Sequence, residues 1–369
     1  MPKEFFRSTI KLSKAAAPIA LFADVTYDLS KHWTFTAGLR YDEEEFRNLG
    51  EETILEVSPA DCVIAPFVPS FGGLPCSALA DLGEDEPLPS GDFDAWLPRA
   101  SIIYRFDDKR SLSLNYARGY RAGGSYIRLV VPPQILDFEP EILDSYELAW
   151  RSQWLDNRLV LNANVFYSDW KDQQISIPGP TGLNFDQLIV NAGTSELYGM
   201  EIEAQMSFSE SLAGFVSLGL SHTEFQDFPF AVDENGDPVN RDDPTFANLA
   251  GNEFNTAPRT TLSVGLAWNH DSGWFASGNA SYASDQFSAV TNLAENRVGE
   301  FILVNARAGY RWNQWSIAGF ADNLFDERVV LSQGLAGVDV ATGEVGLNPT
   351  PSFTVNDPRV FGLEVRFRN

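Results

Sequence analysis

Residues 138–175 read FEPEILDSYELAWRSQWLDNRLVLNANVFYSDWKDQQI, and this stretch decides the fold. Around a central Asp156–Asn157 turn, every second residue is apolar. The apolar positions are Tyr146, Leu148 and Trp150 before the turn and Leu159, Leu161, Ala163, Val165 and Tyr167 after it. A period of two is that of a β-strand, whose successive side chains point to opposite faces. The stretch therefore predicts a β-hairpin with one apolar and one polar face.

The same alternation recurs along the chain and predicts thirteen strands. Many of them run to about ten residues, which suits a tilted transmembrane strand better than the five or six residues common in globular sheets. The predicted strands cover residues 21–29, 33–41, 96–106, 112–116, 146–150, 159–167, 198–208, 216–220, 262–268, 274–282, 302–312, 315–321 and 361–367.

The connections alternate between short turns and long loops. Six short turns lie near Ser30, 107–109, Asp156, Glu210, Asp271 and Asn313, and the long loops cover residues 43–95, 122–142, 171–197, 226–256, 288–301 and 326–358. A sheet with every long loop at one end is typical of an outer-membrane β-barrel, which has tight periplasmic turns and long extracellular loops. Aromatic residues near the strand ends fit the interfacial girdles of such a barrel.

The second face of these strands is polar and partly charged. A soluble sandwich core could not hold so many charges without large desolvation costs, whereas a wet or plugged barrel lumen can. The lumen-facing set includes Glu147 and Arg151, Glu201 and Glu203, Arg307, and Glu364 and Arg366.

The amino-acid composition argues against a nucleic-acid-binding function. The formal net charge is −25 and the pI is near 4.4, which opposes binding to nucleic acid phosphates. Most of the charge lies in two predicted loops, with −13 in residues 42–95 and −6 in residues 226–256. No apolar run is long enough for a transmembrane helix, and the first residues do not read as a signal peptide.

With these features in place, the chain resembles the C-terminal part of a TonB-dependent outer-membrane receptor barrel. The motifs that carry the resemblance begin with LFADVTYDLSKHWTFTAGLRYD at Leu21, LSLNYARGYRAGG at Leu112 and the stretch quoted above. They continue with NAGTSELYGMEIEAQ at Asn191, GNEFNTAPRTTLSVGLAW at Gly251, ADNLFDERVV at Ala321 and DPRVFGLEVRF at Asp357.

The resemblance implies a barrel of about 22 strands filled by an N-terminal plug, in the outer membrane of a Gram-negative bacterium. We therefore expect residues 21–369 to be the C-terminal part of the barrel and residues 1–20 to be a truncated start, with a remnant strand near residues 5–12. The plug, the first strands and the segment that contacts the TonB complex would be absent.

The resemblance also implies uptake of a scarce solute, with a ferric siderophore as the expected ligand and no cofactor. Arg121 and Tyr126 in YRAGGSYIR, with Phe228 and Phe230 in a later loop, are the candidate ligand contacts. An equally simple interpretation is that Arg121 joins neighbouring loops and the aromatic rings pack within them. The lumen charges Glu147, Arg151, Glu201, Glu203, Arg307 and Arg366 are expected to hold the plug.

Cys62 and Cys76 are the two cysteines, both in the first long loop, and we expect a disulfide between them if the loop is exported; two free thiols are the alternative. The three histidines lie on different strands without metal-ligand spacing, so no metal site is predicted. The acidic run at residues 233–237 carries proline where a calcium loop needs glycine, which favours a solvated turn.

No catalytic motif appears, so we predict a receptor and not an enzyme. Four alternatives stay open: TonB-dependent uptake of an oligosaccharide or cobalamin, a passive porin, an outer-membrane hydrolase, and a soluble carbohydrate-binding β-protein.

Overall fold

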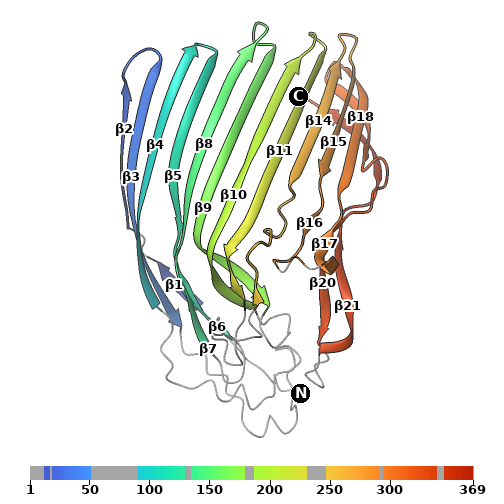
Figure 1. Cartoon of the computed structure of the whole chain (residues 1–369). Helices are drawn as coiled ribbons and strands as arrows, with labels where there is room; N and C mark the ends of the chain where they lie inside the picture. Colours follow the sequence, from blue (N-terminus) through green and yellow to red (C-terminus); the bar gives the residue numbers. More distant parts are fainter. Residues whose placement is uncertain are drawn as a thin grey trace, which may run out of the picture.

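The computed structural model describes residues 12–16, 19–50, 90–128, 134–178, 187–230, 247–290, 292, 294–338 and 345–368, and one large antiparallel sheet dominates it (Figure 1). The strands of this sheet are β1 (Leu12–Ala16), β2 (Ile19–Asp28), β3 (Trp33–Gly50), β4 (Ser90–Asp107), β5 (Arg110–Arg121), β8 (Glu141–Trp154), β9 (Leu159–Pro178), β10 (Gln187–Ser207), β11 (Leu212–Asp227), β14 (Thr260–Asn269), β15 (Trp274–Ala283), β18 (Phe301–Trp312), β19 (Trp315–Asp322) and β22 (Val360–Phe367). The prediction of an antiparallel all-β barrel wall is confirmed.

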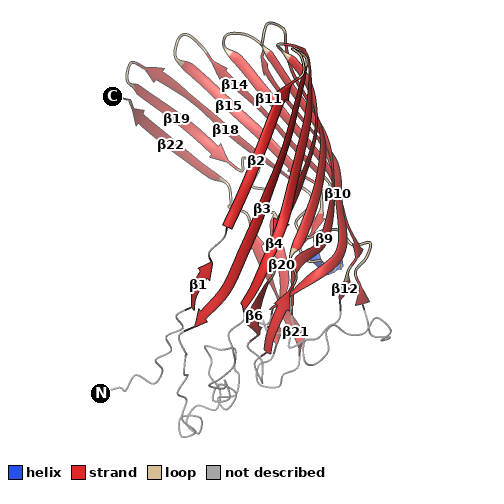
Figure 2. Ribbon diagram, turned by 90° about the vertical axis from the view of Figure 1, so that its left-hand side faces the viewer, coloured by secondary structure: helices blue, strands red, loops and turns tan. Residues whose placement is uncertain are grey.

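The sheet has thirteen strand positions, as predicted. β1 and β2 both pair with β3, with Ala16 opposite Phe46 and Ile19 opposite Glu43, so β1 continues the line of β2 along the same neighbour. From β3 to β22 the spatial order follows the chain order. Figure 2 shows the sheet curving as an open wall, with β2 near one edge and β22 at the other.

Six tight turns connect consecutive strands of the sheet, and all lie at one end, which we call the hairpin end (Figure 1). Their residues allow the tight geometry: Leu155, Asp156 and Asn157 have φ values between 54° and 67°. Gly273 has φ +99°, and a Cβ there would lie 2.3 Å from the carbonyl oxygen of Arg311, so this turn requires glycine. The six predicted turns are confirmed.

The opposite end, which we call the loop end, carries four two-stranded sheets (Figure 1). They pair β6 (Gly124–Arg128) with β7 (Gln134–Phe138), β12 (Pro229–Phe230) with β13 (Ala247–Asn248), β16 (Gln286–Phe287) with β17 (Arg297–Val298), and β20 (Val330–Val338) with β21 (Val345–Val355). A 3-10 turn, η2, spans Ala294–Asn296.

The strands run further into the predicted loops than the sequence pattern indicates. β3 continues through residues 43–50 and β4 begins at Ser90, both inside the loop predicted for residues 43–95. β9 and β10 likewise extend into the loop predicted for residues 171–197. Beyond the apolar band, polar and apolar residues no longer alternate regularly between the two faces, so the sequence signal of a strand disappears although the backbone hydrogen bonds continue.

The outer face of the sheet is apolar and open. Leu21, Leu114 and Leu363 are 67%, 52% and 79% exposed, as expected for side chains that meet lipid instead of a protein core. Aromatic rings gather near both ends of this face, as in the pairs Trp33–Tyr104 and Tyr41–Trp96, whose centroids lie 4.7 and 4.8 Å apart. In the described part of the chain, no helix has the length and hydropathy needed to cross a membrane.

On the inner face, a phenylalanine ring lies over a glycine of the neighbouring strand at four places. The pairs are Phe166 with Gly199, Phe215 with Gly265, Phe275 with Gly309, and Phe320 with Gly362. A Cβ at any of these glycines would lie 2.2 to 2.8 Å from the ring. Glycine is therefore what lets each ring approach the backbone this closely.

Substituting one of these glycines tests the arrangement. A Cβ at Gly309 would lie 2.2 Å from the carbonyl oxygen of Ile317 and 2.6 Å from the Phe275 ring, so Gly309→Val is expected to lower the free energy of unfolding by about 2 kcal/mol. Chemical denaturation of the protein in lipid vesicles measures this. The matched control is Gly319→Val on the next strand, where the nearest side-chain atom is 3.8 Å away. Equal stability of the two variants would contradict the close packing.

Candidate functional site

The structure brings the six predicted lumen charges to the inner face of the sheet. Glu201 and Glu203 of β10 stand opposite Asn164 and Asn162 of β9, on the side away from the exposed Tyr198. The inner-facing residues of β8 include Glu147 and Arg151. Those of β18 and β22 include Arg307, Glu364 and Arg366. The period of two therefore sorts polar from apolar residues onto opposite faces.

Three carboxylates on β8 and β10, the two strands that flank β9, form what we call the carboxylate patch: Glu147, Glu201 and Glu203. Glu147 accepts hydrogen bonds from the side-chain amides of Asn115 at 3.1 Å and Asn164 at 3.3 Å. Among the described residues, no lysine or arginine forms an ion pair with any of the three. The patch is therefore a negative surface supported by amides and not neutralised from within the sheet.

The two predicted arginines near the other edge are already paired. Arg307 donates two hydrogen bonds to Glu364, at 3.0 and 2.9 Å, and its guanidinium reaches across β19 to do so. Arg366 donates to the same carboxylate at 3.1 Å. Glu364 thus joins β22 to β18 through side chains, in addition to the backbone ladder between β19 and β22.

A hollow of about 980 Å³ lies on the inner face, and Arg307 and Glu364 are among the residues that line it. Amides, small residues and two aromatic rings line much of it. The lining residues include Gln205, Phe215, Asn279, Asn305, Arg307 and Phe320. A polar domain packed against this wall would find hydrogen-bonding partners along its whole width.

At the loop end, Arg121 joins neighbouring strands. Its Nη2 donates to Glu141 at 2.8 Å and to the backbone carbonyl of Gln174 at 3.1 Å, which connects β5, β8 and β9. The Glu141 side chain is 9% exposed and that of Arg121 is 56% exposed. The simpler interpretation of Arg121, that it bonds neighbouring segments, matches these contacts, and one side of the guanidinium is open to solvent.

The three aromatic residues predicted to contact the ligand lie in different surroundings. The Phe228 ring is fully buried against Phe225, with centroids 4.8 Å apart, in a small core that also contains Ala192 and Val290. In this arrangement Phe228 makes packing contacts inside the loop end. Tyr126 lies in β6 and Phe230 in β12, and their side chains lie outside the described part of the structure.

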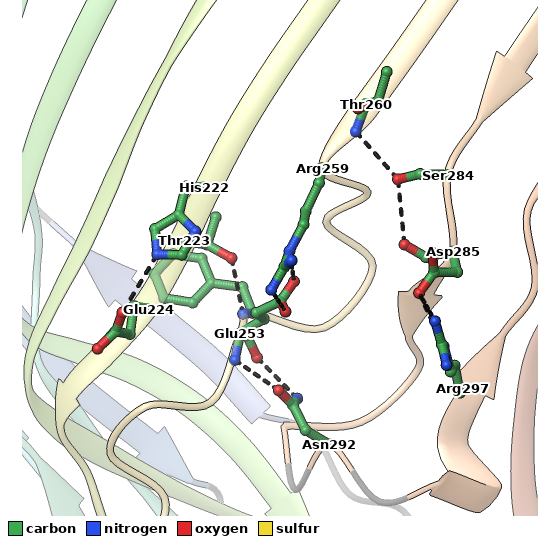
Figure 3. Close-up of polar contacts among 11 residues, drawn as sticks. His222, Thr223, Glu224, Glu253, Arg259, Thr260, Ser284, Asp285, Asn292 and Arg297 are labelled. Carbon is green, nitrogen blue, oxygen red and sulfur yellow. Dashed lines mark hydrogen bonds and ion pairs between the residues drawn. The ribbon is translucent and has the colours of Figure 1, made fainter.

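A polar network holds the segment that follows this core (Figure 3). The backbone N–H of Phe254 donates to Thr223 at 3.0 Å, and Arg259 donates to Glu253 at 3.1 Å. Asn292 completes the network, because its side-chain oxygen accepts from the Glu253 N–H at 2.6 Å and its amide donates to the Glu253 carbonyl at 3.0 Å. The hydrogen bonds with Glu253 hold the pKa of Arg259 above its usual value.

The motifs ADNLFDERVV, which begins at Ala321, and DPRVFGLEVRF, which begins at Asp357, meet at the base of the β20–β21 hairpin. Asn323, 7% exposed, donates to the carbonyls of Glu327 at 2.9 Å and Asp357 at 3.2 Å. The backbone N–H of Arg359 donates to Asp326 at 3.0 Å, and this hydrogen bond lowers the pKa of the Asp326 carboxyl. These motifs therefore serve to fix the hairpin on the sheet.

Each histidine has its own local partner. His32 contacts the carbonyl of Arg105 at 2.7 Å, His222 lies 3.3 Å from Glu224, and His270 lies 2.7 Å from Ser272. Within the ranges that the structure covers, no three histidine, cysteine or acidic residues are grouped so that they could hold a metal ion. Cys62 and Cys76 lie outside the described residues, so their pairing stays a prediction.

Sequence reasoning from the residues missed Glu253, Arg259 and Asn292 as a unit. Glu253 and Arg259 lie in a motif noted above, but Asn292 follows them by more than thirty residues. Because their contact depends on the paths of two loops, no local spacing signals it.

Comparison with known proteins gives a consistent result. The family model described as "TonB dependent receptor-like, beta-barrel" matches residues 5–324. The pesticin receptor of Yersinia enterocolitica is 26% identical over 213 residues, which are 57% of this chain and 26% of that protein. The ferric-pyoverdine 358 receptor of Pseudomonas putida is 23% identical over 235 residues, 61% of this chain and 26% of that protein. The chain thus spans about a quarter of the length of these curated relatives.

Solved structures share the fold. The ferric yersiniabactin uptake receptor FyuA from Yersinia pestis has a TM-score of 0.68 and 19% identity, with 95% of this chain and 45% of that chain covered. The ferric citrate transporter FecA in its unliganded form has a TM-score of 0.61 and 15% identity, with coverage of 95% and 45%. At these identities the similarity establishes the architecture.

The burial of Phe228 leads to a test of its role. Phe228→Ala would leave a cavity in the loop-end core, which costs about 3 kcal/mol and raises local opening roughly a hundredfold. Hydrogen exchange of the backbone amides in residues 249–254 measures this opening. The control is Phe208→Ala near the hairpin end, where the ring is 50% exposed and no change at residues 249–254 is expected. Unchanged exchange together with lost ligand binding would instead make Phe228 a ligand contact.

Proposed function

The chain belongs to the TonB-dependent receptors, whose β-barrel domain it matches over residues 5–324, and we propose that it forms part of a receptor that imports a ferric siderophore by TonB-energised transport. Members of this family are outer-membrane proteins of Gram-negative bacteria, and they are transport receptors, not enzymes. The predicted location and the prediction of a non-enzyme agree with the family.

The rest of the barrel is part of this proposal. β2 and β22 each pair with one strand in the described sheet, and both run toward the hairpin end. Antiparallel closure between two edges that run the same way requires an odd number of further strands. A barrel of about 22 strands would need about nine beyond the thirteen described, which meets this condition. We propose that these strands and the plug lie N-terminal to β1.

Support for the ligand class comes from the relatives. Proteins similar to this chain are named as receptors for pesticin, ferric pyoverdine and ferric yersiniabactin. The related fold also occurs in a protein named as a copper transporter, so the fold alone does not select the solute. A siderophore is the choice that the sequence relatives favour.

The observation that carries the mechanism is the carboxylate patch. Three charges that lack a cationic partner within the described sheet lie on a face that lipid does not reach. We propose that basic side chains of the plug pair with Glu147, Glu201 and Glu203 and hold it in the lumen. Complementary charge across an interface fixes orientation and rejects wrong arrangements, which a reversibly displaced plug requires. Arg151 lies on the same strand as Glu147, at the edge of the proposed contact between the plug and the carboxylate patch.

Uptake measurements test the transport function. A strain that lacks the receptor is complemented with the full-length gene, and accumulation of ⁵⁵Fe from a panel of siderophores is followed with and without a functional TonB protein. We expect accumulation of at least one ferric siderophore that depends on both the receptor and TonB. Receptor-dependent accumulation that continues without TonB, together with a permanently open channel in planar bilayers, would instead favour the passive porin.

Neutralising the carboxylate patch tests plug retention. Glu201→Gln with Glu203→Gln should leave plug cations unpaired, which costs about 2 kcal/mol or more, so channel openings in planar bilayers under urea should rise at least about tenfold. Glu210→Gln in an exposed hairpin turn is the matched control and should have no effect. Equal opening of both variants would contradict the proposed contact.

A further inference from the structure

A second charged feature lies on the inner face at the hairpin end. Arg311 is the next-to-last residue of β18, and its guanidinium carbon lies 4.1 Å from the centroid of the Phe275 ring on β15. Its Nη1 donates a hydrogen bond to the side-chain oxygen of Asn269 at 2.9 Å. Stacking on one side and a hydrogen bond on another fix the guanidinium in place before any partner binds.

Arg311 has no carboxylate partner among the residues that the structure describes. Its Nε and Nη2 hydrogens are not used in any described contact, and the residue is exposed. An arginine with a fixed plane and two unused donors is suited to a carboxylate, which accepts two parallel hydrogen bonds.

The surroundings of Arg311 add positive charge. Arg311 stands opposite Ser316 on β19, and Ser316 stands opposite Arg366 on β22, so the two arginines border the same serine. Arg366 shares the single carboxylate of Glu364 with Arg307. The arginine site, defined as Arg307, Arg311, Glu364 and Arg366, therefore has a net charge of +2.

The geometry points to a docking site for an acidic segment of the domain that fills the lumen, with its carboxylates bound between Arg311 and Arg366. This inference rests on the proposed function, because it takes the plug as the occupant of the lumen. The site faces the inside of the wall, where a peptide segment packs and lipid headgroups do not reach. The carboxylate patch and the arginine site then present opposite charges on different strands, which would set the rotation of the plug about the barrel axis.

The bordering serine allows a direct test. In the full-length receptor expressed in the outer membrane, Ser316 is replaced by the photo-crosslinking residue p-benzoylphenylalanine and the crosslinked peptides are identified by mass spectrometry. We expect a crosslink to a segment N-terminal to β1 that contains aspartate or glutamate. A crosslink to a segment without acidic residues, to lipid or to another protein would overturn the inference, and so would the absence of any crosslink above background.

Charge variants supply the control. Arg311→Glu should reduce the crosslink at least about tenfold, since like charges then face each other, and Arg311→Lys should reduce it less because the positive charge remains without the stacked plane. Arg368→Glu, beyond the end of β22, should leave the yield unchanged. Equal yields from Arg311→Glu and Arg368→Glu would contradict an electrostatic site. A crosslink to the acidic segment in a receptor that imports no iron would leave the docking site standing and refute only the siderophore proposal.

Discussion

The structure depends on one constraint: within a lipid bilayer, a backbone N–H or C=O that lacks a protein partner has no water to replace it. Each strand must therefore bond to neighbours on both sides, which leads to the continuous ladder from β3 to β22. The ladder forces side chains to alternate between two faces, so leucines such as Leu114 meet lipid while Glu147 on the next strand points inward. The positions of the loops, the loop-end core and the charged sites follow from this hydrogen-bonded sheet.

The inner face is divided into regions with different chemistry. The four phenylalanine–glycine pairs keep bulky rings close to the sheet, and Phe215, Gly265 and Phe320 line the hollow of about 980 Å³. Carboxylates that have no ion-pair partner among the described residues occupy β8 and β10, whereas an excess of arginine occupies β18 and β22. A wall of this kind can bind a second domain by complementary charge without burying a large apolar surface, so the bound domain can also be released.

Much of the fold could be predicted from the sequence because a period of two is a direct consequence of strand geometry. The six turns and the thirteen positions followed from it, and so did the shared face of Glu201 and Arg307. The extension of β3 beyond Tyr41 could not be predicted, since polar and apolar residues no longer alternate regularly there. The burial of Phe228 and the contact of Asn292 with Glu253 depend on loop paths, which leave no periodic signal. The stack of Arg311 on Phe275 likewise needs the register between β15 and β18.

One sheet crosses the outer membrane with alternate residues facing lipid. A nitroxide scan along residues 159–168 of β9 in the membrane-inserted receptor tests it most directly, by comparing accessibility to oxygen, which concentrates in lipid, with accessibility to a polar nickel chelate. A strand in this orientation should show a period of two, with maximal oxygen accessibility at Leu161, Ala163 and Val165 and minima at the residues between them. Uniform access to the polar chelate, or a period of 3.6, would contradict it.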